Sequence, residues 1–213
     1  MTLTHTPLMK SQNGFNLFEL MIVVAVLGTM LSIGVPGLQS FILDNRISSQ
    51  LNLLSSSLAL ARSEAVKNNQ PVVVCVTSDG AACDTSGVAW NTGWLVFIDR
   101  NGDMGVDAGS AGTDGCAEGA TADCVLAVQA AFSGENTLSP GPGVPNLIAY
   151  DGTGTARCDK TADGSYEACV NADTYFTLCD FRGAGHARAL SISKTGRSAV
   201  LDKKPTGGAL TCP

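Results

Sequence analysis

The chain has 213 residues, enough for one globular domain and a membrane anchor. Charged residues make up only 15% of it, and its 24 glycines favour a loop-rich β domain and argue against a helical bundle. The formal net charge is −6 at pH 7, and it becomes −7 without residues 1–14, which hold one basic and no acidic residue.

The first predicted element is a transmembrane helix. From Phe15 to Val35 the chain has 21 residues with one ionisable side chain, Glu19. A helix of that length covers about 31 Å, enough for a bilayer core. A secretory signal peptide is disfavoured because no small-x-small cleavage site follows directly. A plain signal anchor leaves Glu19 unexplained, since an acid in a membrane helix is costly without a partner. We expect residues 1–14 to be a leader and residues 15–36 to be the transmembrane half of a longer helix.

Residues 37–70 are predicted to form the second, amphipathic half of that helix. Apolar residues recur there at spacings of three and four, which places them on one helical face. These residues are Leu43, Ile47, Leu51, Leu54, Leu58, Ala61 and Ala65. We expect this face to pack on a C-terminal sheet and the polar run 68–70 with Pro71 to end the helix. A kink or local melting is expected between Gly28 and Pro36.

Residues 71–213 are predicted to be a disulfide-rich β domain. Short β-branched and apolar runs alternate there with Gly, Asp, Asn and Pro. The predicted strands are residues 72–77, 94–99, 125–128, 147–150, 174–179, 189–192 and 198–201. No further helix pattern occurs, so the expected fold class is α+β with a mainly antiparallel sheet. Residues 105–124 and 152–172 are interpreted as cysteine-bearing insertions.

All eight cysteines lie in this β domain, which indicates an oxidising compartment. Eight cysteines allow 105 pairings, and proximity in the sequence favours one set of four. These pairs are Cys75–Cys83, Cys116–Cys124, Cys158–Cys169 and Cys179–Cys212. A zinc site is disfavoured because there is no C-x-x-C pair and the only histidines are His5 and His186.

Two other kinds of site are weakly supported. The loop from Asp99 to Asp107 has acid or amide groups at alternate positions, as a calcium loop does. It has Met104 at the glycine position and Ser110 where a bidentate Glu is required, so a polar turn is the favoured interpretation. No Ser or Cys has a base at motif spacing, and we expect no enzyme activity, no cofactor and no metal.

The start of the predicted helix resembles a known processing signal. Gly14-Phe15-Asn16-Leu17-Phe18-Glu19-Leu20 is similar to the class III signal of type IV prepilins and type II secretion pseudopilins. The resemblance implies cleavage by a prepilin peptidase between Gly14 and Phe15, and N-methylation of Phe15. Glu19 is then the fifth mature residue. Its carboxylate is expected to neutralise the amine of a neighbouring subunit, because both charges are costly in a membrane when unpaired.

Further motifs resemble the FimT/FimU/GspH branch of minor pilins and pseudopilins. They are Ser63-Glu64-Ala65, Gly93-Trp94-Leu95-Val96-Phe97-Ile98-Asp99 and Lys194-Thr195-Gly196-Arg197, with Cys179 and Cys212 as that branch's C-terminal disulfide. The resemblance implies a type IV pilin-like fold and a structural role. A minor type IV pilin is the first interpretation, a GspH-like pseudopilin of type II secretion the second, and a DNA-binding minor pilin for DNA uptake the third.

The resemblance also implies the location and the partners. The subunit is expected in the bacterial inner membrane with one span and a periplasmic C-terminal domain, and afterwards in a pilus fibre or pseudopilus. Its expected partners are other pilins, minor pilins or pseudopilins, the prepilin peptidase, the inner-membrane assembly platform and, for DNA uptake, DNA.

Charge is segregated along the β domain. From Asp79 to Asp180 the net charge is −12, whereas from Arg182 to Lys204 it is +5. The second segment contains a basic strip, namely Arg188, Lys194, Arg197, Lys203 and Lys204. Such a strip attracts either a phosphate backbone or an acidic neighbouring subunit. DNA-binding FimT-type pilins use a Gly-Arg-x-Arg element, and the matching positions Gly196 to Ala199 lack its second arginine.

Overall fold

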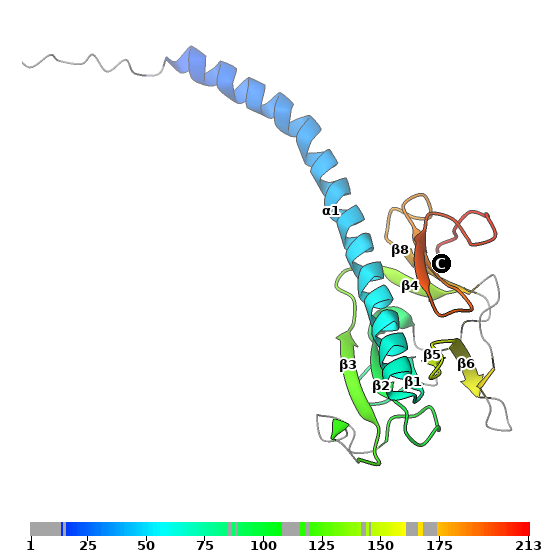
Figure 1. Cartoon of the computed structure of the whole chain (residues 1–213). Coiled ribbons are helices and arrows are strands. Elements are labelled where there is room, and N and C mark those ends of the chain that lie inside the picture. Colours follow the sequence, from blue (N-terminus) through cyan, green and yellow to red (C-terminus); the bar gives the residue numbers. More distant parts are fainter. Residues whose placement is uncertain are drawn as a thin grey trace, which may run out of the picture. The chain divides into compact units, whose positions relative to one another are not determined.

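The structure is a computed structural model that describes part of the chain. It describes residues 14, 16–84, 87, 89–107, 116–117, 120–141, 144, 146–160, 166–167 and 174–213, with the backbone alone for residues 158–160 and 166–167. The chain divides into two compact units, one up to Ile42 and one from Leu43 to Pro213. Figure 1 shows the long N-terminal helix and the β domain.

Helix α1 spans Leu17–Asn68 and belongs to both units. Asn16 begins it, because its side-chain oxygen accepts a hydrogen bond from the Phe18 amide at 3.4 Å. The helix ends at Asn68, where Asn69 adopts a left-handed φ of 50° and Pro71 follows. The helix runs without a break through Gly28 and Pro36, so the local melting that the sequence suggested does not occur in this stretch.

In the first unit, the described helical residues from Leu17 to Ile42 are exposed. An 18-residue window of α1 near the N-terminus has a mean hydropathy of 2.2, and α1 is long and apolar enough to cross a membrane. Thr29 and Ser32 donate their hydroxyl hydrogens to backbone carbonyls of the helix itself. This segment therefore presents apolar side chains on all sides.

The second unit contains two antiparallel sheets. The strands are β1 (Val72–Val76), β2 (Gly93–Ile98), β3 (Cys124–Ala130), β4 (Thr137–Pro140), β5 (Leu147–Tyr150), β6 (Ala156–Lys160), β7 (Tyr166–Glu167), β8 (Tyr175–Cys179), β9 (Arg188–Ile192) and β10 (Ser198–Leu201), and a short 3-10 helix, η1, spans Trp90–Thr92. The larger sheet has the order β3-β2-β1-β5-β6-β7 and the smaller has the order β10-β9-β8-β4. The expected α+β class is confirmed.

All seven strands predicted from apolar runs are present. Strands β4, β6 and β7 were not predicted from the sequence. Strand β4 ends in Pro140 and lies at the edge of the smaller sheet, where a residue without an N–H is tolerated. Strand β6 reads Ala-Arg-Cys-Asp-Lys and has no apolar run. These strands form because a neighbouring edge offers hydrogen bonds, which a propensity pattern does not detect.

One main core joins α1 to both sheets. The predicted helical face is buried from Ile47 to Ala65, and it packs with inward residues of β1, β2, β5, β8 and β9. Trp90 and Trp94 are fully buried in this core. The indole N–H of Trp94 donates to the Ser57 hydroxyl of α1 at 2.9 Å. The side-chain oxygen of the buried Gln50 accepts a hydrogen bond from the side-chain amide of Asn136 at 2.6 Å. This polar residue within the apolar face therefore has a hydrogen-bond partner.

Each sheet is also covered on its other face. On the larger sheet a second cluster joins Val73, Cys75, Leu95, Phe97 and Ala149, with Cys83 and Val106 of two loops packed against it. On the smaller sheet, Leu210 and Cys212 of the C-terminal tail pack against β8 and β9 residues. This double coverage explains why β1, β2 and β8 are buried at every position and do not alternate.

Candidate assembly and binding surfaces

The predicted processing residues lie at the start of α1. Gly14 is exposed and has no atom within 4 Å of the position that a Cβ would occupy. Phe15 lies outside the described residues. Glu19 is exposed in the first turn of α1. Gly14 and Glu19 are therefore both on the surface of the described part of the chain.

Three of the four cysteine pairs that spacing predicts are present in the described part of the chain. Cys75–Cys83, Cys116–Cys124 and Cys179–Cys212 have Cα–Cα distances of 5.6, 4.6 and 5.8 Å. The fourth expected pair, Cys158–Cys169, lies outside the described side chains. Cys75–Cys83 attaches a loop to the outer face of β1, and Cys179–Cys212 attaches the C-terminal tail to the outer face of β8.

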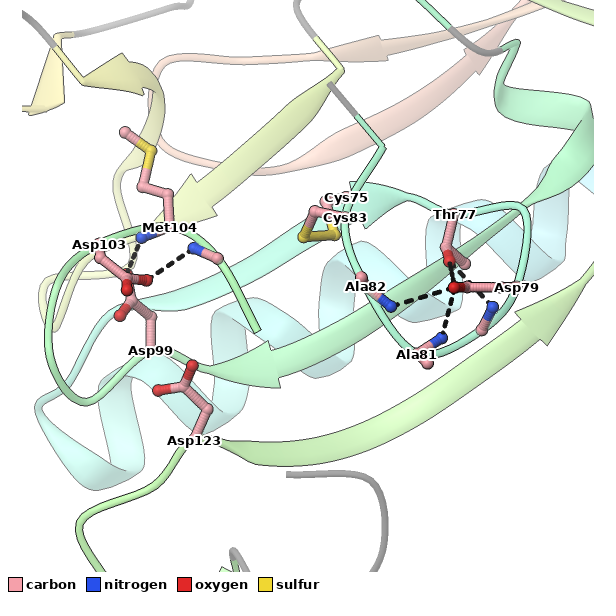
Figure 2. The surroundings of a disulfide bond; sticks show 12 residues. Cys75, Thr77, Asp79, Ala81, Ala82, Cys83, Asp99, Asp103, Met104 and Asp123 are labelled. Atoms are coloured by element: carbon pink, nitrogen blue, oxygen red, sulfur yellow. Dashed lines mark hydrogen bonds between the residues drawn. A yellow bond between two sulfur atoms is a disulfide. The ribbon is translucent and has the colours of Figure 1, made fainter. Parts of the chain in front are cut away.

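The loop closed by Cys75 and Cys83 is built around Asp79 (Figure 2). The Asp79 carboxylate accepts hydrogen bonds from the Ala81 and Ala82 amides at 2.8 and 3.1 Å and from the Thr77 hydroxyl at 3.0 Å. The two amide hydrogen bonds are the main reason why the pKa of Asp79 is lowered. These hydrogen bonds therefore hold the turn in the loop, and the ionised carboxylate of Asp79 is their acceptor.

The Asp99–Asp107 loop forms a compact acidic turn beside Asp123 (Figure 2). Carboxylate oxygens of Asp99, Asp103 and Asp123 lie within 4.8 Å of one another, and these are the described residues that could hold a cation. Sequence reasoning missed Asp123, because it lies in the insertion before β3 and only the fold brings it near Asp99.

The two buried acids of this turn are hydrogen-bonded by the backbone. Asp99 accepts from the Gly102 and Met104 amides at 2.7 and 3.0 Å. Asp123 accepts from the Arg100 and Asp107 amides at 2.9 and 3.1 Å. Burial raises the pKa of Asp123, although these amides oppose the change. The arrangement is that of a polar turn closed by its own amides.

The structure separates the basic strip into two groups. Strands β9 and β10 form a hairpin in which Ser198 pairs with Ile192 and Leu201 pairs with Ala189. Lys194 and Arg197 lie at its turn, whereas Arg188, Lys203 and Lys204 adjoin its open end. Because strand residues advance about 3.4 Å each, the two ends of β9 lie about 14 Å apart. Of the basic strip, only Lys194 therefore lies at the same turn as Arg197, and Arg188, Lys203 and Lys204 are too far along the hairpin to replace the missing second arginine.

Arg197 instead shares a cleft with Arg62 of α1. The cleft has a volume of about 580 Å³ and is lined by Ala59, Arg62, Ser63, Val66, Thr153, Gly196, Arg197 and Ser198. Arg62 donates from Nε to the Gly154 carbonyl at 3.1 Å, and this positions it between α1 and two turns of the β domain. Gly196 adopts a left-handed φ of 73° with the Gly154 carbonyl close by, which leaves no room for a side chain. The sequence contains no motif that marks Arg62 as a partner of Arg197, because only the fold brings the two residues together.

A second cluster of charges connects the β8–β9 loop with α1. Arg182 contacts the Asp180 carboxylate and the Asp44 carboxylate, each at 2.7 Å, and its side chain is 13% exposed. The His186 ring nitrogen lies 3.9 Å from Asp44. Burial of Asp180 opposes its ionisation, but hydrogen bonds and the charge of Arg182 outweigh it, so the pKa of Asp180 is lowered.

The sequence matches a known family over most of this second unit. The family is described as "Type II transport protein GspH", and the match extends over residues 50–196, more than two-thirds of the chain. The chain belongs to the GspH family. The matched region begins at Gln50 in α1 and ends at Gly196 in the β9–β10 turn, so it includes most of the main core and the part of the cleft up to Gly196. The resemblance inferred from the sequence motifs is thus confirmed at the level of the family.

Among solved structures, two crystal forms of one protein are similar to this chain. Both are the type IV minor pilin FimU of Pseudomonas aeruginosa, strain PAO1. The first has 19% identity and a TM-score of 0.49, covering 81% of this chain and 99% of FimU. The second has 19% identity and a TM-score of 0.45, covering 78% and 99%. No curated protein matched this GspH-family chain significantly.

Proposed function

We propose that this GspH-family chain is a minor type IV pilin, a structural subunit that takes part in starting assembly at or near a pilus tip. The observation that carries the proposal is the first part of α1, which is apolar on all sides and has a single acid, Glu19, five residues after Gly14. The family and the fold are those of structural subunits, and we propose that this subunit acts in assembly.

The assembly step follows from the chemistry of the processed N-terminus. Cleavage after Gly14 leaves Phe15 with a free amine, which is a cation in the same apolar layer as Glu19. A neighbouring subunit's amine and the carboxylate of Glu19 neutralise each other, whereas either charge alone is costly in a lipid or a packed fibre. The pair also fixes how far one helix slides along the next.

The proposed location follows from the anchor and the disulfides. Residues 15–36 cross the inner membrane, and the β domain faces the periplasm until the subunit enters the fibre. Disulfides persist in the periplasm and outside the cell. The disulfides staple surface loops and the tail of the domain, which suits both the pilus and the pseudopilus, and the pilus is our first choice. The prepilin peptidase, the assembly platform and other pilins are the proposed partners.

Processing tests this proposal directly. Gly14→Val is expected to leave uncleaved precursor in the membrane, and intact-mass analysis of wild-type protein is expected to show N-methylated Phe15 as the first residue. Gly28→Val is the matched control, because Gly28 also has open space around it and lies outside the signal. A mature chain that begins at any other residue overturns the assignment.

A second candidate function is that of a type II secretion pseudopilin. The matched family is described by that transport system, and the helix and its acid serve a pseudopilus equally well. Deleting the gene separates the two candidates. Loss of twitching motility with intact secretion supports the pilus, and loss of secretion with intact twitching supports the pseudopilus.

A third candidate function, DNA uptake, rests on the cleft that joins Arg62 and Arg197. Two guanidinium groups beside the hydroxyl residues Ser63, Thr153 and Ser198 suit a phosphate. DNA binding by the full chain in detergent is expected to weaken steeply with salt and to be reduced by Arg62→Ala and by Arg197→Ala. Arg188→Ala, at the opposite end of the hairpin, is the control. Equal loss in all three variants, or no binding at low salt, removes this candidate.

A further inference from the structure

The cleft that joins Arg62 and Arg197 holds two positive charges without an acid among its described residues. None of the eight described residues that line it is acidic, and neither arginine forms an ion pair in the described part of the chain. The acids nearest to lining residues in the sequence are already paired, namely Glu64 with Lys67 and Asp151 with Arg157. The cleft is therefore a local positive site on a chain of net negative charge.

Hydrogen bonds fix the positions from which both arginines enter the cleft. Arg62 donates from Nε to the Gly154 carbonyl at 3.1 Å, so its two terminal nitrogens remain as donors. Arg197 belongs to a turn in which its carbonyl accepts from the Ser193 amide at 2.8 Å and its amide donates to the Ser193 hydroxyl at 3.1 Å. The cleft lies wholly in the second unit, so it does not depend on the direction of the apolar segment.

The two guanidinium groups are the main donors that the cleft offers to an anion. The Ser63 hydroxyl donates to the Leu60 carbonyl at 2.9 Å and the Thr153 hydroxyl donates to the Asp151 carboxylate, so both hydroxyl hydrogens are already used. A guanidinium presents its N–H groups as a planar fork that matches a carboxylate. A DNA backbone instead contacts a row of cations, and the basic strip is divided between the two ends of the hairpin. The cleft therefore fits one carboxylate better than the phosphates of the third candidate function.

The same chain presents such a carboxylate on the Asp99–Asp107 turn (Figure 2). Asp103 is exposed, and its carboxylate accepts from the Asn101 side-chain amide and from the Gly105 amide at 2.9 and 2.8 Å, so it is held in one position on the turn. The turn and the adjacent Asp123 contain four acids and one arginine, a net charge of −3. A guanidinium that approaches Asp103 from outside is therefore attracted by the whole turn.

The cleft and the acidic turn of one subunit face different neighbours. Ile98 of β2 and Tyr150 of β5 both lie opposite Val72 of β1, so the turns that follow β2 and β5 leave the same end of the larger sheet. Val106 of the acidic turn packs on the sheet face away from α1, whereas the cleft lies on the α1 face. A contact between the cleft of one copy and the turn of another is therefore head to tail.

We propose that the cleft docks the Asp99–Asp107 turn of a second copy of this chain, with the Asp103 carboxylate between the guanidinium groups of Arg62 and Arg197. The inference rests on the proposed function, because it gives the fibre subunit a contact between β domains in addition to its helix. Since the contact is head to tail, each copy keeps one free cleft and one free turn, and the contact extends a row of subunits.

Charge exchange tests the contact with the full chain in detergent. Asp103→Arg and Arg197→Glu each place like charges in the contact, so association between copies, measured by sedimentation, is expected to weaken about tenfold or more. An equimolar mixture of the two variants is expected to recover wild-type association, because every contact between unlike variants is again complementary. Arg188→Glu is the control, since it reverses an exposed charge at the other end of the hairpin and is expected to leave association unchanged.

Recovery in the mixture also shows that both variant chains are folded. The proposal is overturned if wild-type copies do not associate, if the mixture does not recover association, or if Arg188→Glu weakens it as much as Arg197→Glu. It is also overturned if a DNA oligonucleotide binds to wild type and not to Arg197→Glu while copies stay apart, because the cleft then takes a phosphate. Processing at Gly14 does not involve the cleft, so a failed exchange refutes this contact and leaves the proposed function standing.

Discussion

At the scale of single residues, Asp180 shows how a partly buried charge is maintained. Burial by itself disfavours the carboxylate, but Arg182 supplies hydrogen bonds and a compensating charge, and the pKa of Asp180 is lowered as a result. Arg182 in turn contacts Asp44, which makes the group a link between a loop and α1. Removing Arg182 leaves the buried Asp180 carboxylate without full compensation, and removing Asp180 does the same to Arg182.

The lowered pKa of Asp180 predicts how stability depends on pH. A carboxyl with a depressed folded-state pKa stabilises the fold fully above its unfolded value of about 3.9, and the contribution is lost as the pH falls through the folded-state pKa. Asp180→Asn is therefore expected to destabilise the β domain at neutral pH, and the difference from wild type is expected to narrow in acid. Chemical unfolding followed by Trp90 and Trp94 fluorescence at several pH values measures this.

Asp202→Asn makes the same substitution at an exposed position and serves as the control. Its unfolding free energy is expected to follow that of wild type across the pH range. A wild-type-minus-variant difference for Asp180→Asn that stays constant from neutral pH into acid would contradict the role of the carboxylate charge.

At the scale of elements, one face of α1 packs against the sheets of the β domain and forms part of its core. Leu51 is 1% exposed and Leu53, two residues along the same helix, is 41% exposed. Leu51→Ala is expected to cost about 2–5 kcal/mol of unfolding free energy, because it removes buried methyl groups and leaves a cavity. Leu53→Ala is expected to change it by about 0.5 kcal/mol or less. Denaturant unfolding of the two full-length variants in detergent compares them, and equal losses would refute the packing of this face.

The two outer-face disulfides also differ in what they contribute. Cys179–Cys212 joins residues 33 positions apart, whereas Cys75–Cys83 joins residues 8 apart. The chain-entropy estimate gives about 3–4 kcal/mol for the longer loop and about 2–3 kcal/mol for the shorter one. Replacing both cysteines of a pair by alanine is thus expected to lower the unfolding midpoint more for the tail disulfide. Thermal unfolding of the two double variants, with peptide mapping to show that the remaining pairs are intact, gives the order, and the reverse order would argue against the entropic account.

At the scale of the whole molecule, the proposed role of Glu19 in assembly connects the fold of one subunit with the fibre. Glu19→Ala is expected to insert into the membrane normally, because helix formation and apolar length are preserved. Its incorporation into pili is expected to fall, since the amine of a neighbour then lacks its partner, and breaking a buried pair costs about 3–5 kcal/mol, roughly a hundredfold or more in association. Quantitative blotting of sheared pili against membranes measures incorporation.

Glu19→Asp retains the charge and shortens the side chain, so it is expected to assemble better than Glu19→Ala. Wild-type levels of Glu19→Ala in pili would show that the carboxylate does not act in assembly. A loss of membrane insertion in Glu19→Ala would instead show that the residue serves the anchor.

Local regularities in the sequence determined the elements that depend on neighbours along the chain. The apolar run and the three-and-four spacing predicted α1, whose buried face from Ile47 to Ala65 is the one expected. Seven apolar runs predicted seven strands, and short spacing predicted the pairing of Cys75 with Cys83. Helix periodicity and loop closure are local properties, so they can be recognised without knowing the fold.

The tertiary structure alone decided which distant residues meet. Asp123 lies beside Asp99, and Arg62 lies in one cleft with Arg197, although the members of these pairs are 24 and 135 positions apart in the sequence. The same folding divided the basic strip, because a hairpin places residues near in sequence at opposite ends of a strand. The edge strand β4 exists because β8 offers it hydrogen bonds. These arrangements depend on sheet order and on the packing of both sheets against α1, which no local pattern contains.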